Sequence, residues 1–159
     1  MTVALKLTHD EPRLVYLALV YHLGRPGSEL DPATRMPVDR GLREVKVALG
    51  SELSADSAII ELDEAQSQKL LSAIYGCVTE LRGHHLRDGA PSTVARFTET
   101  ALSVFPQIKA DPEEALVISE AMVMLHRRMK RALERAAESA GGETAIAEAP
   151  PKRGWPFRR

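Results

Sequence analysis

Residues 14–23 read Leu-Val-Tyr-Leu-Ala-Leu-Val-Tyr-His-Leu, and this run decides the fold of the chain. It is apolar on nearly every side, apart from the polar tips of Tyr16, Tyr21 and His22. A helix that is apolar all round has to be buried. Ten residues are also far too few to cross a membrane, which takes about 20. The run therefore predicts the central helix in the core of a soluble protein.

A short strand and a helix start precede this run. Apolar Val3, Leu5 and Leu7 alternate with residues of the opposite face, which is the period-2 pattern of a strand. Thr8 and Glu11 have the spacing of a capping box. In that motif the hydroxyl accepts a hydrogen bond from a first-turn backbone N–H, and the carboxylate reaches back to the cap residue. The sequence thus predicts a strand that leads directly into the central helix.

The same strand–cap–helix pattern returns later in the chain. Residues 58–62, Ala-Ile-Ile-Glu-Leu, again have the pattern of a strand, and Asp63 and Gln66 repeat the capping box before a helical run. We interpret residues 3–53 and 58–108 as a weak internal repeat. The alternative is that any two capped strand–helix units look alike, and the sequence does not decide between them.

One segment between these units is ambiguous. Residues 39–53 fit a half-exposed helix, and we favour that interpretation because charged residues lie between the apolar ones. Val45, Val47 and Leu49 also alternate like a strand, which would pair with residues 58–62 in a hairpin. The sequence alone leaves both structures open.

Three more helices are expected after residue 63. The first covers residues 64–83, the second follows Ser92, and the last begins at Asp111 and runs to about Ser139. Asp at the N-cap followed by Pro at the first helical position is a strong helix start. The pair Gly141–Gly142 is expected to end the last helix.

The composition is ordinary for a globular protein, with 44% hydrophobic and 27% charged residues. We predict one mostly helical α+β domain over residues 1–140, with four or five helices around the central apolar helix and two short strands. A flexible basic and aromatic tail is expected at residues 141–159. No secretory leader is recognised at the N-terminus, so a cytoplasmic location is expected, and no membrane contact.

No catalytic or cofactor motif stands out, and we expect neither catalysis nor a cofactor. His84, His85 and Asp88 lie in one loop and carry groups that bind zinc and other transition metals. Adjacent histidines diverge, however, and no second cluster supplies further ligands, so a solvated polar loop is the preferred interpretation. His22 and Cys77 are expected to be core residues rather than a catalytic pair.

The last predicted helix carries a cluster of five basic residues: Arg127, Arg128, Lys130, Arg131 and Arg135. Arg127, Arg131 and Arg135 fall four residues apart, hence on one stripe of the helix, with Arg128 beside them. A solvated surface with cations near a helix C-terminus explains the pattern without any function. The functional interpretation is contact with an anionic partner.

The tail is the second candidate surface. Trp155 is the only tryptophan of the chain, and it lies with Phe157, Arg158 and Arg159 in a segment that offers no core to bury it. Aromatic residues and arginine are enriched at binding hot spots. The tail therefore suggests a docking segment, the alternative being an inert chain end.

Together these features predict a non-catalytic adaptor or regulatory protein that acts through a protein partner or through self-association. One alternative is a nucleic-acid-associated factor that uses the basic last helix and the tail, although the net charge of −1 does not favour it. The other alternative is a small metal-dependent enzyme that uses the loop with His84, His85 and Asp88.

Overall fold

The computed structural model describes residues 2–25, 40–83, 86 and 92–146, with the backbone alone at residue 40 and from residue 140 onward. It confirms the predicted class, a mostly helical α+β fold with one two-stranded antiparallel sheet. The order of elements is β1 (Thr2–Thr8), α1 (Glu11–Gly24), α2 (Arg40–Glu52), β2 (Ser57–Asp63), α3 (Glu64–Arg82), α5 (Phe97–Val104), α6 (Gln107–Ala110) and α7 (Glu114–Ile146). The described part thus holds six helices, of which α6 is a single turn.

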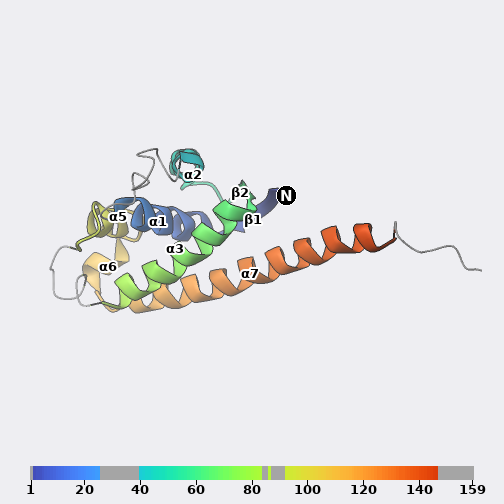
Figure 1. Cartoon of the computed structure of the whole chain (residues 1–159). Coiled ribbons are helices and arrows are strands. Elements are labelled where there is room, and N and C mark those ends of the chain that lie inside the picture. Colours follow the sequence, from blue (N-terminus) through green and yellow to red (C-terminus); the bar gives the residue numbers. More distant parts are fainter. Residues whose placement is uncertain (1, 26–39, 84–85, 87–91, 147–159) are drawn as a thin grey trace, which may run out of the picture.

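Helix α1 lies at the centre of the molecule, as the apolar run predicted. It packs against β1, α2, α3 and α5 and touches α7, so that elements surround it on all sides (Figure 1). Leu17, Ala18 and Leu19 are fully buried, and His22 is also buried. The absence of a polar face on α1 is explained by this arrangement, because none of its residues is fully exposed and most are buried.

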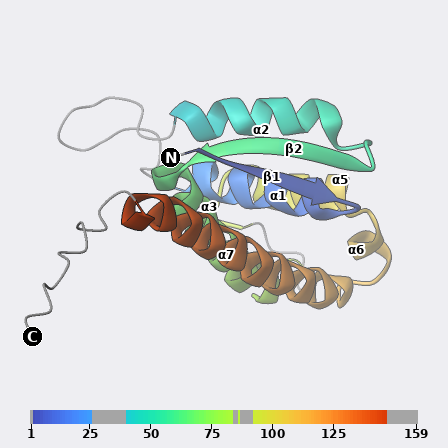
Figure 2. The same ribbon diagram turned by 90° about the vertical axis from the view of Figure 1, so that its right-hand side faces the viewer.

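The two strands form the sheet with each other. Leu5 pairs with Ile60 and Leu7 with Ala58, and these four side chains are buried against the helices while the opposite face is exposed. Residues 40–52 are helical, so the strand alternative for that segment is wrong. Figure 2 shows α2 running along the β2 side of the sheet and α7 along the β1 side. Two strands alone are marginally stable, and the helices hold them.

The two predicted capping boxes turn out to be different. At α3 the box is complete, since Asp63 Oδ1 accepts from Gln66 N–H at 2.7 Å and Gln66 Oε1 accepts from Asp63 N–H at 2.9 Å. At α1 only the return half exists, in which Thr8 N–H donates to Glu11 Oε2 at 2.8 Å. Asp10, not Thr8, is the N-cap there, and its side chain makes no cap hydrogen bond. The internal repeat stays a prediction, but its two caps are not equivalent.

Helix α7 packs along α3 and extends beyond the rest of the described structure (Figure 1). It has an apolar stripe of which four members are buried and the fifth is partly buried: Ile118, Met122, Leu125, Met129 and Leu133. The helix continues through Gly141 and Gly142 to Ile146. The expected end near Ser139 is therefore wrong, and residues 147–159 of the predicted tail lie outside the described residues.

Two glycines mark places where helices approach closely. A Cβ on Gly76 of α3 would lie 2.5 Å from Tyr21 Cε1 of α1, so the tyrosine ring rests on the bare helix backbone. The same ring meets Phe97 edge to face, with 6.0 Å between centroids. A Cβ on Gly24 would lie 2.5 Å from the Ala95 carbonyl oxygen, which explains a glycine at the end of α1 without any unusual backbone angle.

Replacing Leu17 with alanine tests the central position of α1. Leu17 is fully buried, so Leu17→Ala lowers the free energy of unfolding by about 2–5 kcal/mol through lost transfer energy and a cavity. Leu133→Ala costs less, because this side chain is only partly buried. Urea melts of both variants measure the difference. A Leu17→Ala protein as stable as the unchanged chain would contradict the arrangement.

Replacing the two cap residues tests the difference between the helix starts. Asp63→Ala lowers the free energy of unfolding by about 1 kcal/mol, because it leaves a first-turn N–H without its acceptor. Thr8→Ala costs clearly less, since the backbone of Thr8 makes the short bond and its hydroxyl lies 3.4 Å from Glu11. Equal losses in thermal melts would show that Thr8 caps α1 after all.

Candidate partner-binding surfaces

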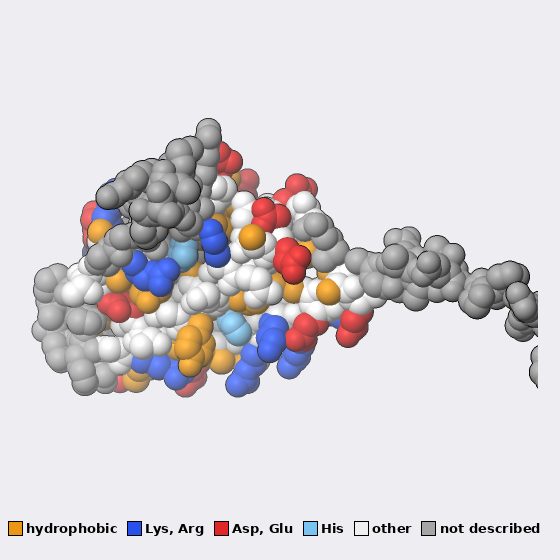
Figure 3. All heavy atoms as spheres, viewed as in Figure 1, with side chains coloured by type: hydrophobic (Ala, Val, Ile, Leu, Met, Phe, Trp, Pro, Cys, Tyr) orange, Lys and Arg blue, Asp and Glu red, His pale blue; other side chains and the backbone are white. Residues whose placement is uncertain are grey.

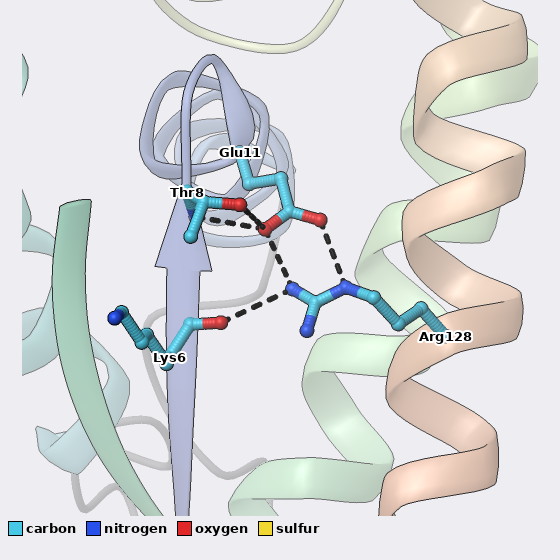
Figure 4. A network of polar contacts seen from close by, with 4 residues as sticks. All are labelled: Lys6, Thr8, Glu11 and Arg128. Carbon is cyan, nitrogen blue, oxygen red and sulfur yellow. Dashed lines mark hydrogen bonds and ion pairs between the residues drawn. The ribbon is translucent and has the colours of Figure 1, made fainter. Parts of the chain in front are cut away.

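Arg128 of α7 makes polar contacts within the chain, although its side chain is 43% exposed. Its guanidinium forms a two-pronged ion pair with Glu11, with 2.8 Å from Nε to Oε1 and 2.6 Å from Nη2 to Oε2. Nη2 also donates to the Lys6 carbonyl at 3.3 Å (Figure 4). Paired N–H···O bonds of this kind are the strongest that arginine makes with a carboxylate. Arg128 therefore ties α7 to the corner between β1 and α1.

The same contacts cover part of the open edge of β1. The Lys6 carbonyl and the Thr8 N–H point away from β2, and they are taken up by Arg128 and Glu11 respectively (Figure 4). Unpaired backbone groups on an edge strand are a template for unwanted strand pairing. The ion pair thus has a structural role that accounts for one member of the predicted arginine set.

Beside this ion pair lies a groove of about 450 Å³ between α7 and the β1–α1 corner, which we call the corner groove. Its residues come from two distant parts of the chain: Thr8, His9, Asp10, Glu11 and Leu14 on one side, and Ala121, Met124, Leu125, Arg127, Arg128 and Arg131 on the other. Met124 is 63% exposed although its side chain is apolar. The lining of the groove therefore combines apolar and charged side chains.

The charges of the corner groove do not cancel. Glu11 pairs with Arg128, and Asp10 pairs with Arg13 at 3.3 Å. Arg127 and Arg131 are exposed and make no ion pair with any residue that the structure describes. The groove is left with two arginine side chains, each of which can bind a carboxylate by donating hydrogen bonds to it.

Arg135 differs from these two arginines. Its Nε donates to the Arg131 carbonyl one turn earlier at 3.2 Å, and it does not line the corner groove. Acidic residues also interrupt the basic stripe, since Lys130 and Glu134 lie 4.0 Å apart on the same helix. In Figure 3, blue and red side chains both follow α7 along the lower side of the molecule.

A second groove, of about 270 Å³, lies on another side of α7, and we call it the α3–α7 groove. It is lined by Val3, Glu64, Ser67, Gln68, Leu71, Lys130, Leu133, Glu134 and Ala137. Its polar residues are mainly acidic or neutral, in contrast to the corner groove. Sequence reasoning missed it, because its walls come from three segments that only the fold brings together.

A third hollow, of about 220 Å³, lies at the C-terminal end of α1 and was also missed. Arg43, Lys46 and Arg96 line it together with Gly24. Cations at the end of a helix are favoured by its dipole, so this cluster has a structural explanation. Arg96 also pairs with Glu99 at 3.9 Å.

The residues considered for catalysis lie in the core. Cys77 is fully buried, and burial raises the pKa of its thiol well above the usual value, with the charge of Glu80 adding to the shift. A thiol that stays protonated is a poor nucleophile. His22 is buried, with Nδ1 2.9 Å from Arg25 Nη2, as expected for a hydrogen-bonded core histidine.

His84, His85 and Asp88 lie outside the described residues, so the predicted loop is not placed. Within the described ranges, no group of three or more histidine, cysteine or acidic residues is arranged to hold a metal ion. Burial lowers the pKa of His126 on α7, and nearby Lys130 lowers it further. Trp155, Phe157, Arg158 and Arg159 also lie beyond the part of the chain that the structure places.

Comparison with known proteins adds no relative: no family model, no curated protein and no solved structure matches the chain. Among the helices that the structure describes, none combines the length and the apolar composition needed to cross a bilayer.

Arginine replacements on α7 test the structural role of Arg128. Arg128→Ala lowers the free energy of unfolding by about 1–2 kcal/mol, because it leaves half-buried Glu11 without its partner. Arg131→Ala, three residues on, changes it by less than about 0.5 kcal/mol. Arg128→Lys recovers only part of the loss, since an ammonium cannot make both bonds. Equal melts for Arg128→Ala and Arg131→Ala would show that the ion pair contributes nothing.

Proposed function

We propose that the chain is a non-catalytic adaptor or regulatory protein, and that its corner groove binds an acidic segment of a protein partner. The observation that supports this most is the pair of exposed arginines, Arg127 and Arg131, beside exposed Met124. Neither arginine forms an ion pair with a residue that the structure describes, and Met124 is exposed although it is apolar. The expected cytoplasmic location is part of the same proposal.

The chemistry of the groove suits a particular kind of segment. Each guanidinium can hold a carboxylate through two parallel hydrogen bonds, and Arg127 and Arg131 are spaced by one helical turn. Methionine adapts to differently shaped apolar side chains, so Met124 can accept one large apolar residue of the partner. The ligand we infer is therefore an acidic segment with a single apolar anchor. Binding through so small a surface is expected to be weak and reversible.

A nucleic-acid partner is the second candidate, because Arg127, Arg131 and Arg135 lie along one stripe. Phosphate binding needs a strongly positive surface. Residues 114–146 of α7 carry five basic and five acidic side chains, so the helix as a whole has a formal charge of zero. This balance favours the protein partner. The metal-dependent enzyme stays a prediction that elemental analysis can test.

A capture experiment with matched charge reversals tests the proposal. The double variant Arg127→Glu and Arg131→Glu should lose proteins that the unchanged chain retains from its native lysate. The control Lys109→Glu and Arg135→Glu carries the same change in charge but spares the groove, and should retain them. The retained proteins should be sensitive to salt and resistant to nuclease.

Two results would contradict the proposal. Loss of all retained material on nuclease treatment would favour the nucleic-acid alternative. Equal retention by the groove variant, the control and the unchanged chain would show that the corner groove takes no part in binding.

A further inference from the structure

The α3–α7 groove contains a buried polar group that the described structure does not satisfy. Ser67 is 1% exposed, and its hydroxyl is the one buried side-chain oxygen or nitrogen among the described residues that has no hydrogen-bond partner. Buried hydroxyls normally have a partner, because leaving one unpaired is costly. Ser67 lines the groove between apolar Val3, Leu71 and Leu133. The groove thus offers apolar walls and a hydrogen-bonding hydroxyl.

The charge of the groove is negative. Glu64 and Glu134 line it, and Lys130 is the one cation among its lining residues. Lys130 and Glu134 are 4.0 Å apart and offset each other, which leaves the charge of Glu64. Asp63 before it and Glu138 one turn after Glu134 are exposed and add to the negative field. A basic segment is the complementary ligand.

We propose that the α3–α7 groove is occupied by the chain's own residues 151–159, with Trp155 between α3 and α7. This segment reads Pro-Lys-Arg-Gly-Trp-Pro-Phe-Arg-Arg, with four basic residues and no acidic one. The indole N–H is a donor that fits the Ser67 hydroxyl, and the indole body fits the apolar walls. The four cations then lie near the acidic rim.

The chain is long enough to reach the groove within one molecule. Helix α7 ends at Ile146, and Ala137 of the groove lies nine residues earlier, roughly 14 Å along the helix axis. The eight residues 147–154 can span at most about 29 Å when extended. A ligand tethered so closely has an effective concentration in the millimolar range, which favours the intramolecular complex over pairing between copies.

The corner groove does not suit the same segment. Arg127 and Arg131 repel a basic peptide, and the two acidic residues that line this groove, Asp10 and Glu11, are already paired with arginines of the chain. The inference therefore does not rest on the proposed function, because it concerns a different groove and a different ligand. Either can fail without the other.

Trp155 reports its own surroundings, because it is the only tryptophan. In the full chain its fluorescence should be shifted to shorter wavelength than that of N-acetyltryptophanamide, and acrylamide should quench it several-fold less. The double variant Glu64→Lys and Glu134→Lys should bring both values close to those of the free compound. The control Glu52→Lys and Glu120→Lys has the same change in charge at exposed sites outside the groove, and should behave like the unchanged chain.

Three results would overturn the inference. The first is emission and quenching of the full chain that match the free compound. The second is an equal response of the groove variant and its control, in protein that retains its melting temperature. The third is a shift that disappears on dilution together with a dimer in light scattering, which would mean that the segment binds a second copy rather than its own groove.

Discussion

Burial of α1 on every side is the constraint on which the rest of the structure depends. A helix without a polar face is stable in water only if other elements cover it completely. Here α2, α3, α5 and the sheet supply most of that cover, and α7 touches α1 directly as well as packing along α3. The sheet needs α1 in turn, since two strands have too little surface to persist alone. Helix and sheet therefore stabilise each other, and neither explains the fold by itself.

Local patterns predicted those parts of the fold that neighbouring residues determine. The period of two found both strands, and the Asp63–Gln66 spacing found a complete capping box, because donor and acceptor lie three residues apart. The equivalent pattern at Thr8 was misleading. There the chain turns at His9, whose φ is 55°, and the His9 N–H donates to the Asp56 carbonyl at 3.0 Å. A contact across 47 positions of sequence moved the helix start, and no local pattern records it.

For the candidate surfaces too, the sequence predicted features that depend on neighbouring residues and missed those that depend on residues far apart in the chain. Spacing along one helix placed the arginines on one stripe, but it could not separate them by their contacts. Arg128 is set apart by Glu11, which lies 117 positions away, while Arg127 and Arg131 line a groove whose other wall is the β1–α1 corner. The sequence did not point to Ser67, because serine is common in helices. Only the folded structure shows that its buried hydroxyl has no hydrogen-bond partner among the described residues. A groove forms where segments distant in sequence pack together, so the sequence alone does not predict which residues line it.

The two grooves along α7 also bear on specificity. A protein discriminates between ligands by repelling the wrong one as well as by attracting the right one. In the proposed arrangement the corner groove carries Arg127 and Arg131, which repel the basic residues 151–159, and the α3–α7 groove carries Glu64, which repels an acidic partner segment. In this proposal, the two grooves along α7 bind ligands of opposite charge, and each groove repels the ligand of the other. Arg128 and Glu11 both line the corner groove, so the ion pair that joins α7 to the β1–α1 corner also joins the two walls of that groove.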